Sequence, residues 1–377
     1  MVYDVVIIGA GTIGISTGYY LSKKGQRVLM IDAHKPPHEQ GSHGGETRLI
    51  RHAYGEGRAY TPLARHAQKL WNDLQAKTDD TIFKQTGILS IAQKDSHFLN
   101  EIRKSAQAYH LPLKDMDRDD LKAAYPSIEL PDDSYGGCFE PESGVVFVDQ
   151  ALSLYLDLAI QNGAELQANT IVESIKQTEK ELFIQTDQGN IQTKQVLIST
   201  GAHQAEWFRE LNLNIELTPK RQVIGWFESD PSFDASTFPG FTFESEQGTF
   251  YGFPSFDGSG VKLGRHDYGT PVDPDHFDRD FTSRPEDEQM LREFLKTFMP
   301  KAAGKLNKGK TCLYTMSPDE DFIIDQHPED KRIHFAAGFS GHGFKFASAL
   351  GEALADRLTD QPTQVDLAMF KMDRFRG

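Results

Sequence analysis

Blocks of apolar and polar residues alternate along this chain and predict its helices and strands. The unbroken apolar run from Val5 to Ile8 is typical of a strand buried on both faces in a parallel sheet. Between residues 62 and 74 the apolar residues can share one helical face, which predicts an amphipathic helix. Helix and strand patterns return at 151–172, 195–202 and 333–358. These segments together predict an α/β domain.

Residues 218–315 show a different pattern, made of short aromatic-rich runs. Examples are Val223–Phe227, Thr249–Phe253 and Val261–Gly264, and residues 88–92 also have the character of a strand. Strands this close together in the sequence favour hairpins, because a parallel pair needs a longer crossover connection. The pattern therefore predicts an antiparallel sheet.

The length of the chain and these two patterns predict two domains. A chain of 377 residues exceeds the usual size of one hydrophobic core. We expect the fold class α/β plus antiparallel β, in which a Rossmann-type nucleotide-binding domain receives a mostly antiparallel substrate domain as an insertion. The nucleotide-binding domain would consist of residues 1–82, 145–217 and 316–377, and the substrate domain of residues 83–144 and 218–315.

The first strand leads into a glycine-rich turn with the spacing of a dinucleotide-binding site. Its glycines allow a tight turn, a close approach of the backbone to a pyrophosphate, and close packing of the following helix on the strand. Asp32 ends the next predicted strand, where a carboxylate can accept hydrogen bonds from a ribose. An ordinary glycine turn would not need this acid. The predicted cofactor-binding residues here are Gly9, Gly11, Thr12, Ile13, Gly14 and Asp32.

Charge and cysteine content restrict the class of partner. The chain has 40 Lys and Arg against 55 Asp and Glu, a net charge of −15, which argues against nucleic acid or an anionic membrane as the main partner. Cys138 and Cys312 are the two cysteines and lie far apart, which argues against a disulfide framework. No apolar run is long enough for a membrane helix, and a strand begins almost at the first residue. We expect a cytoplasmic protein.

Residues 35–45 contain too many prolines and glycines for regular structure, so they predict a long functional loop. His34, His38 and His43 lie in or beside it, and imidazoles bind transition metals. The two prolines between His34 and His38 prevent a pair one helical turn apart. We therefore expect no metal site.

Five further segments carry a stronger signal. They are GSHGGETRLIRHAYGEG at 41–57, YGFP at 251–254, KLGRH at 262–266, CLY at 312–314 and GFSGHGFKF at 338–346. In this order, over essentially the whole chain, they resemble the family of monomeric sarcosine oxidase and N-methyltryptophan oxidase. Such flavoproteins have a D-amino acid oxidase-like fold and oxidise N-methyl amino acids with oxygen, giving the demethylated amino acid, formaldehyde and hydrogen peroxide. The resemblance implies FAD, a small N-methyl amino acid and O2 as ligands, and a monomer.

The resemblance gives Cys312 a specific role. It occupies the position at which the family attaches FAD covalently, through a thioether to the flavin 8α-methyl group. For an arbitrary cysteine the expectation would be a buried, inert thiol. Cys138 matches no site of the family and is expected to be structural. The resemblance adds further cofactor-binding residues: Arg48, Val172, Gly341, His342, Gly343 and Lys345. Near His342, backbone amides would face the flavin pyrimidine, where negative charge collects on reduction.

Six residues are implied in catalysis. Arg51 and Lys345 would bind the substrate carboxylate, arginine as a planar fork and lysine as a mobile point charge. Lys262 would lie over the flavin and assist oxygen reduction as a fixed positive charge. Strand alternation points its side chain away from its neighbours, so we expect it to stand alone in a cavity. The others are His266, which would interact with the amine, and Tyr251 and Tyr314, which would line the pocket for the methylamine.

The segments that bear on substrate specificity resemble different members of the family. Residues 221–230 and 254–256 resemble sarcosine oxidase, whereas residues 317–325 and Thr242 resemble N-methyltryptophan oxidase. Where Thr242 lies, sarcosine oxidase has a methionine, and a smaller polar side chain could admit a larger substrate. We expect a small N-methyl amino acid such as sarcosine, with a bulky aromatic one as the alternative. A flavin dehydrogenase that passes electrons to a carrier, and a non-catalytic flavin-binding protein, stay open as other classes.

Overall fold

One large sheet carries the N-terminal strand in its interior. The computed structural model describes residues 2–55 and 57–375, and in it β1 lies between two parallel neighbours, β2 and β12. The strand order is β10-β11-β12-β1-β2-β9, with β20 paired to β12 and β19 paired to β20. The strands are β1 (Val2–Ile8), β2 (Val28–Ile31), β9 (Glu165–Gln167), β10 (Val172–Gln177), β11 (Leu182–Thr186), β12 (Gly189–Ile198), β19 (Ile323–Gln326) and β20 (Ile333–Ala337).

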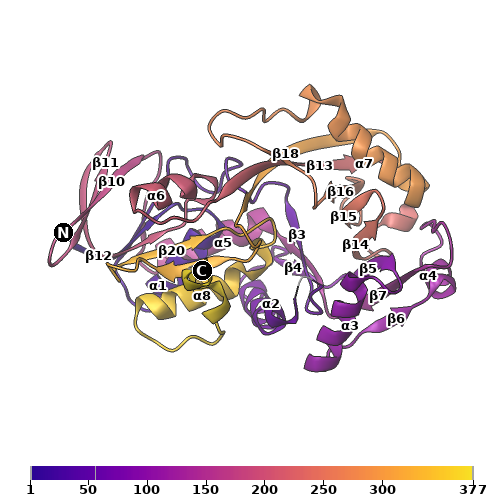
Figure 1. Cartoon of the computed structure of the whole chain (residues 1–377), viewed down its shortest axis with the longest axis horizontal. Helices are drawn as coiled ribbons and strands as arrows, with labels where there is room; N and C mark the ends of the chain where they lie inside the picture. The colour runs from indigo at the N-terminus through magenta and orange to yellow at the C-terminus, as the bar shows by residue number, and fades with distance from the viewer. Residues whose placement is uncertain (1, 56, 376–377) are drawn as a thin grey trace.

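Helices cover this sheet, as Figure 1 shows, and pack on one another. The first helix, α1 (Thr12–Lys23), contacts both α5 (Val148–Gln161) and α8 (Ala347–Leu358), and α8 also contacts α2 (Thr61–Gln75). In α2 the apolar face predicted from the sequence is the buried one, because Trp71 and its apolar neighbours face the core. The short helix α6 (Gln204–Glu210) follows β12. The amphipathic pattern therefore predicted the packing face correctly.

A second, nine-stranded sheet forms the other half of the molecule. Its strand order is β17-β13-β16-β15-β14-β5-β7-β6, with β18 paired to β13. The strands are β5 (Ile88–Gln93), β6 (Lys114–Met116), β7 (Tyr135–Glu140), β13 (Thr218–Phe227), β14 (Gly240–Ser245), β15 (Gly248–Phe253), β16 (Val261–Arg265), β17 (Thr270–Pro271) and β18 (Leu306–Met316). The pairs are antiparallel except for β5 and β14, which run parallel.

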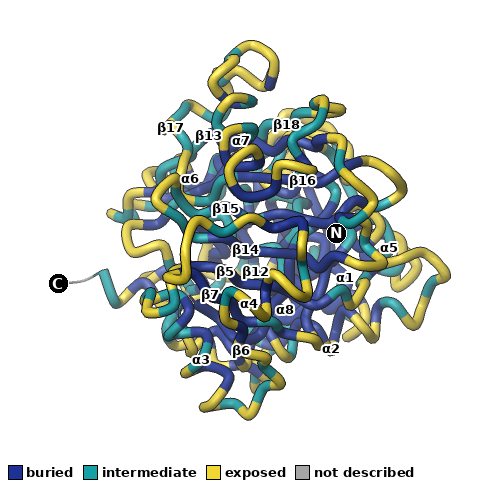
Figure 2. The backbone as a smooth tube through the Cα atoms, turned by 90° about the vertical axis from the view of Figure 1, so that its right-hand side faces the viewer, coloured by how far each residue is buried: buried dark blue, intermediate teal, exposed yellow. Residues whose placement is uncertain are grey.

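Aromatic packing holds this sheet to its helix α7 (Pro285–Phe298). The rings of Phe250 and Phe294 stack with centroids 4.1 Å apart, and Phe243 and Phe298 lie 4.5 Å apart. Helices α3 (His97–Tyr109) and α4 (Arg118–Ala124) flank β5 and β7. Figure 2 shows most of the backbone of β5 and β14 in dark blue, with exposed loops in yellow around it.

A small third sheet and two long strands connect the halves (Figure 1). The third sheet has the order β3-β8-β4, made of β3 (Thr47–Ile50), β8 (Gly144–Phe147) and β4 (Phe83–Lys84). β13 and β18 pair along almost their whole length. The eight strands of the large sheet come from the segments expected to bind the nucleotide, and the nine strands of the other sheet from the segments expected to bind substrate. The domain boundaries themselves stay a prediction.

Three local predictions need correction. The run at 195–202 is not one strand, because β12 ends at Ile198 and a 3-10 turn follows at Gly201–His203. Ile171 lies outside β10, which begins at Val172. In the segment 333–358 the helix begins only at Ala347, because a 3-10 turn occupies Phe344–Phe346 and contains Lys345.

Candidate functional site

A cavity of about 720 Å³ lies beyond the carboxyl ends of β1, β2, β12 and β20. In open parallel sheets this is where ligands bind, since loops diverge there and helices begin. The cavity takes in the glycine turn after β1, the acid after β2 and the loop after β20. Predicted cofactor residues on its wall are Gly9, Gly11, Thr12, Ile13, Asp32, Arg48, Val172, Gly341 and Gly343.

The glycine turn has the geometry that the spacing predicts. A Cβ added to Gly14 would lie 2.0 Å from the carbonyl oxygen of Gly9, so only glycine lets α1 begin this close to β1. A Cβ on Gly11 would meet nothing within 4 Å, because this residue faces the open cavity. Gly14 therefore serves the packing of helix on strand, whereas Gly11 leaves room for a ligand.

Asp32 is an ionised acceptor at the edge of the cavity. Its Oδ2 accepts a hydrogen bond from the Ala10 amide at 2.8 Å. Its Oδ1 accepts one from the His34 amide at 2.8 Å and lies 3.0 Å from His38 Nε2. Burial alone would raise the pKa of Asp32, but these hydrogen bonds bring it below its ordinary value. The His38 contact was not expected, since no pattern along the chain indicated that the loop folds back onto this acid.

The proline- and glycine-rich loop lines the cavity, as its predicted functional role requires. It contains no helix or strand between Asp32 and Glu46. The rings of His34 and His38 lie 5.2 Å apart, and those of His38 and His43 lie 5.8 Å apart. Burial lowers the pKa of His43 to about 4, so this imidazole is neutral near pH 7. Within residues 2–55 and 57–375, no group of His, Cys, Asp and Glu is arranged to hold a metal ion.

A second cavity of about 80 Å³ adjoins the first. Arg48 and Gly341 line both cavities, together with Tyr314 and Phe344. Gly341 has φ +81°, and a Cβ there would lie 2.2 Å from the Tyr314 ring, so glycine allows the loop after β20 to approach β18. The guanidinium of Arg48 donates to the carbonyl oxygens of Ser42, Gly44 and Thr47 at 2.7–3.0 Å. Arg48 is thus a fixed positive charge at the junction.

Five of the six predicted catalytic residues line the small cavity: Arg51, Tyr251, His266, Tyr314 and Lys345. Arg51 is buried, and its guanidinium carbon lies 5.0 Å from the ring centroid of Tyr54 and 5.3 Å from that of Phe98. The Lys345 ammonium donates to the Tyr54 hydroxyl at 3.0 Å. Two cations from distant parts of the chain therefore meet in one small cavity. His342, predicted at the cofactor, lines this cavity rather than the large one.

Two phenols and an imidazole form another part of the wall. Burial raises the pKa of Tyr251 and raises that of Tyr314 well above its ordinary value, and the neighbouring Tyr251 raises the latter further. Both hydroxyls therefore stay protonated near pH 7 and can donate hydrogen bonds. The ring of His266 lies 5.6 Å from that of Tyr314. The sequence analysis expected these three side chains in one pocket, and the structure places all three on the wall of the small cavity.

Lys262 is placed differently from the prediction. Its side chain does not stand alone in a cavity, and it lines neither of the two cavities described above. Its Nζ donates to the carbonyl oxygens of Gly45 at 2.7 Å and Thr47 at 3.0 Å and to the Thr47 hydroxyl, and it lies 3.6 Å from the Phe253 ring centroid. Burial, and then the charge of Arg48, lower its pKa well below the usual value. Strand alternation gave the correct side of β16 but could not show that β3 covers it.

The two cysteines are both free and buried. Cys312 lines neither cavity, although Tyr314 on the same strand lines both. Burial raises the pKa of the Cys312 thiol, and the charges of Arg48 and Lys262 oppose this effect. Cys138 pairs through its thiol with Asp115 at 3.5 Å, and burial raises its pKa to about 12. The charges near Cys312 are thus those of the cations Arg48, Lys262 and Arg221, whereas Cys138 lies near both Arg103 and the carboxylate of Asp115.

Sequence reasoning missed several residues of the small cavity. Phe98, near the start of α3, lines this cavity. The ring of Tyr54 lies close to the charged groups of both Arg51 and Lys345. Their only sequence signal is that Tyr54 lies in the conspicuous segment 41–57. Thr242, singled out for specificity, does line the cavity, and its hydroxyl donates to the Ser90 hydroxyl at 2.9 Å. Other residues that were not predicted are Leu49, Thr249, Phe250 and Phe253.

Comparison with known proteins decides the family. The DAO family, described as FAD dependent oxidoreductase, matches residues 4–357. The chain belongs to this family. A monomeric sarcosine oxidase from Bacillus sp. (strain NS-129) is 44% identical over 375 residues, which cover 99% of this chain and 97% of the relative. An N-methyl-L-tryptophan oxidase from Yersinia pestis (strain Pestoides F) is 38% identical over 378 residues, the whole of both chains.

Solved structures of low sequence identity share the fold of this DAO family member. An L-proline dehydrogenase from P. horikoshii superimposes with a TM-score of 0.87, covers 100% of this chain and 98% of its own, and is 21% identical. NikD, an amino acid oxidase essential for nikkomycin biosynthesis, has a TM-score of 0.86 with 98% and 97% coverage and 19% identity. The predicted architecture, a Rossmann-type FAD-binding domain with a mostly antiparallel insertion, is confirmed.

This DAO family enzyme is an FAD-dependent oxidoreductase, and its large cavity fits that cofactor. Gly11 faces open space, Asp32 offers an ionised carboxylate, and the cavity lies where a dinucleotide binds in such sheets. The predicted dinucleotide site is therefore consistent with the family. In the described part of the chain no helix combines the length and the apolar character needed to cross a bilayer.

Proposed function

We propose that the enzyme oxidises a small N-methyl amino acid such as sarcosine with O2. One sarcosine, one O2 and one water would give one glycine, one formaldehyde and one hydrogen peroxide, which balances atoms and electrons. The names of relatives that are 38–44% identical over nearly the whole chain support this reaction class. The name of the sarcosine oxidase relative supports a monomer.

The observation that carries this proposal is that Arg51 and Lys345 line one small cavity next to the dinucleotide cavity. Two cations at a buried, aromatic-walled site favour a small anion, and a carboxylate matches the planar fork of arginine. A substrate carboxylate held there would place its amine toward the junction formed by Arg48, Tyr314 and Gly341. Binding would thus orient the reacting N-methyl group before chemistry.

FAD, when bound, supplies the acceptor for the two electrons lost by the N-methyl group. We propose that it is attached covalently through Cys312, since Arg48 and Lys262 place positive charge beside this thiol. Gly14 would keep the α1 amino terminus close to the pyrophosphate, and Asp32 would bind the ribose. The remaining residues proposed to hold it are Gly9, Gly11, Thr12, Ile13, Arg48, Val172, Gly341, His342, Gly343 and Lys345.

The residues on the other side of the small cavity would act on the amine of the substrate. Tyr251 and Tyr314 keep their hydroxyl protons near pH 7, so either can donate to the substrate, and their rings enclose its methyl group. His266, beside Tyr314, can take a proton from the amine or interact with its lone pair. Their place in the small cavity supports the proposed catalytic roles of these three residues.

Lys262 would provide positive charge for oxygen reduction. Its three oxygen acceptors match the three N–H groups of an ammonium, whereas a neutral amine has only two, so they oppose the effect of burial on its pKa. A fixed charge in a buried place stabilises a developing oxygen anion more strongly than one in water. The role is electrostatic, because the side chain lies behind Gly45 and Thr47.

The size of the small cavity favours a small substrate. Phe98, Phe250 and Phe253 fill much of the surrounding space, leaving about 80 Å³. Thr242 favours the larger N-methyl-L-tryptophan, because a small side chain on the cavity wall leaves more room for the substrate. Its hydroxyl is already bonded to Ser90, so it offers its methyl group rather than a polar contact to the substrate.

Product stoichiometry tests the proposal. Purified holoenzyme with sarcosine should consume O2 and release formaldehyde and hydrogen peroxide in equal amounts. Glycine is the matched control, since it has the same carboxylate and amine without the methyl group, and it should give no formaldehyde. Sarcosine oxidation that needs an artificial electron acceptor and consumes no O2 would instead identify a dehydrogenase.

A further inference from the structure

Tyr54 connects the proposed carboxylate site to a histidine that the proposed reaction leaves without a role at the substrate. Its side chain is fully buried, with 0% exposure. Its hydroxyl accepts a hydrogen bond from the Lys345 ammonium at 3.0 Å and lies 2.9 Å from His342 Nδ1. Lys345 and His342 both line the small cavity, whereas Tyr54 lies behind it. A single phenol therefore joins two cavity residues.

The other ring nitrogen of His342 sets the direction of these bonds. His342 Nε2 lies 3.2 Å from the carbonyl oxygen of Glu320, which can only accept. Nε2 must therefore carry a proton, and in the neutral ring Nδ1 is then an acceptor. With the ring in this neutral form, the Tyr54 hydroxyl donates to Nδ1 and turns its lone pairs toward Lys345. All the bonds from Lys345 to Glu320 run in one direction, an arrangement in which each bond strengthens the next.

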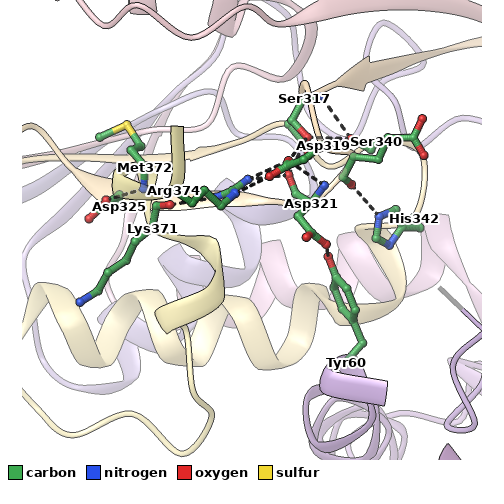
Figure 3. Close-up of polar contacts among 12 residues, drawn as sticks. Tyr60, Ser317, Asp319, Asp321, Asp325, Ser340, His342, Lys371, Met372 and Arg374 are labelled. Atoms are coloured by element: carbon green, nitrogen blue, oxygen red, sulfur yellow. Dashed lines mark hydrogen bonds and ion pairs between the residues drawn. The ribbon is translucent and has the colours of Figure 1, made fainter. Parts of the chain in front are cut away.

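The loop that supplies Glu320 is held from two sides, as Figure 3 shows. This loop, residues 317–321, connects β18 with β19. The Tyr60 hydroxyl donates to the Asp321 carboxylate. Arg374, near the C-terminus, donates to Asp319 Oδ2 at 2.6 Å and to the Asp321 carbonyl oxygen at 3.1 Å. The carbonyl group that sets the His342 tautomer is therefore fixed by the C-terminal segment.

Aromatic packing also restricts the imidazole. The His342 ring centroid lies 4.6 Å from that of Phe322 and 5.4 Å from that of Tyr60. A ring between two aromatic neighbours, with a polar contact at each nitrogen, has little freedom to rotate. This packing holds Nδ1 facing the Tyr54 hydroxyl.

We propose that Tyr54 and His342 are positioning residues that hold the Lys345 ammonium ready for the substrate carboxylate. A free lysine side chain has many rotamers, and binding would have to order it. Fixing it beforehand raises the affinity for a carboxylate without changing the oxidation step. The inference rests on the proposed function in one respect, that Lys345 binds a carboxylate.

Acetate binding to the holoenzyme, measured by calorimetry, tests this directly because it needs no turnover. Tyr54→Phe removes only the hydroxyl, and we expect acetate to bind about tenfold more weakly, the effect of one hydrogen bond to a charged group. Tyr155→Phe is the matched control, since it removes another buried hydroxyl, 3.4 Å from that of Tyr20, from a residue that lines neither cavity. It should leave the dissociation constant within twofold of wild type.

Two further pairs of variants separate positioning from a loss of structure. His342→Asn keeps an acceptor near the place of Nδ1 and should restore most of the acetate affinity that His342→Ala loses. Arg374→Gln releases the 317–321 loop and should weaken acetate about threefold. Arg332→Gln, which removes a comparable ion pair with Asp330, should have no effect. For Tyr54→Phe, the rate of flavin reduction at saturating sarcosine should stay within threefold of wild type.

The outcomes distinguish the two proposals. If wild type binds acetate and Tyr54→Phe binds it equally well, the positioning role is wrong while the proposed function stands. If the reduction rate of Tyr54→Phe falls tenfold with acetate affinity unchanged, Tyr54 acts in the chemical step and the positioning role is also wrong. If wild type neither binds acetate nor is reduced by sarcosine, the proposed function fails first. Should Tyr54→Phe not fold, the pair at His342 decides.

Discussion

Arg51 and Lys345 face the same phenol ring: the guanidinium carbon of Arg51 lies 5.0 Å and the ammonium nitrogen of Lys345 lies 5.1 Å from the ring centroid of Tyr54. Like charges that share one small cavity repel one another. The aromatic face offsets part of this repulsion. A substrate carboxylate in this cavity would be attracted by both charges.

Replacing Arg51 should weaken substrate binding more than it slows oxidation. Arg51→Lys keeps the charge but loses the planar fork, and the loss of a charge-assisted bond predicts a KM for sarcosine raised about 10- to 100-fold. The limiting rate of flavin reduction should fall much less. Arg118→Lys, at an exposed ion pair with Asp133, serves as control. An unchanged KM for Arg51→Lys would remove Arg51 from the carboxylate site.

Replacing Lys262 should slow the reoxidation of the flavin by O2 far more than its reduction by substrate. Lys262→Met removes the charge beside Gly45 and Thr47 while filling a similar volume. We expect reoxidation of the reduced enzyme by O2 to slow at least 100-fold, and reduction by sarcosine to slow less than about tenfold. Stopped-flow absorbance measures both steps separately. Equal slowing of the two steps would contradict the electrostatic role in oxygen reduction.

Covalent attachment of flavin should depend on one cysteine. After acid precipitation, wild type should stay yellow and show the mass of the chain plus FAD, whereas Cys312→Ser should release its flavin. Cys138→Ser is the control because its thiol is also buried and free. It should keep the bound flavin. A wild-type polypeptide of unmodified mass would show that Cys312 carries no flavin.

Acid should destabilise the fold through a buried imidazole. Burial, and then the charge of Arg357, lower the pKa of His334 to about 3, against about 6.5 when unfolded. Between these values the unfolded chain binds a proton that the folded chain does not, so stability falls as pH falls. For this residue the loss between pH 6.5 and 4.5 is about 2 kcal/mol. Urea unfolding at both pH values should show it.

The matching variant removes that dependence. His334→Gln has no group that titrates in this range and can keep the hydrogen bond to Gln195, which His334 Nε2 makes at 3.0 Å. Its loss of stability between the two pH values should therefore be about 2 kcal/mol smaller than that of wild type. His276→Gln, at an exposed histidine, should behave as wild type does. An unaltered pH dependence in His334→Gln would show that other groups govern acid unfolding.

Local sequence patterns predicted the parts of the site that depend on local backbone geometry. Gly9, Gly14 and Asp32 lie within one strand-turn-helix-strand unit, so their spacing alone predicted the dinucleotide site and its place at the strand ends. The resemblance at conspicuous segments then predicted five residues of the small cavity. Both kinds of signal are contained in short stretches of chain.

The rest depends on contacts between distant segments, which no local pattern contains. Lys262 meets the oxygens of Gly45 and Thr47 because β3 folds over β16, and periodicity could show only which side of the strand it occupies. Phe98 enters the small cavity because α3 packs next to it. The parallel pairing of β5 with β14 has the same origin. These features follow from the assembly of the sheets rather than from any one element.

The small cavity is proposed to bind an N-methyl amino acid for oxidation. The most direct measurement is an anaerobic titration of the purified yellow holoenzyme with sarcosine and, separately, with N-methyl-L-tryptophan, following the absorbance of oxidised flavin. We predict complete bleaching by sarcosine, at a rate well above that for N-methyl-L-tryptophan. Faster bleaching by N-methyl-L-tryptophan would contradict the small-substrate assignment. If dithionite bleaches the flavin and neither amino acid does, the function proposed for this cavity is wrong.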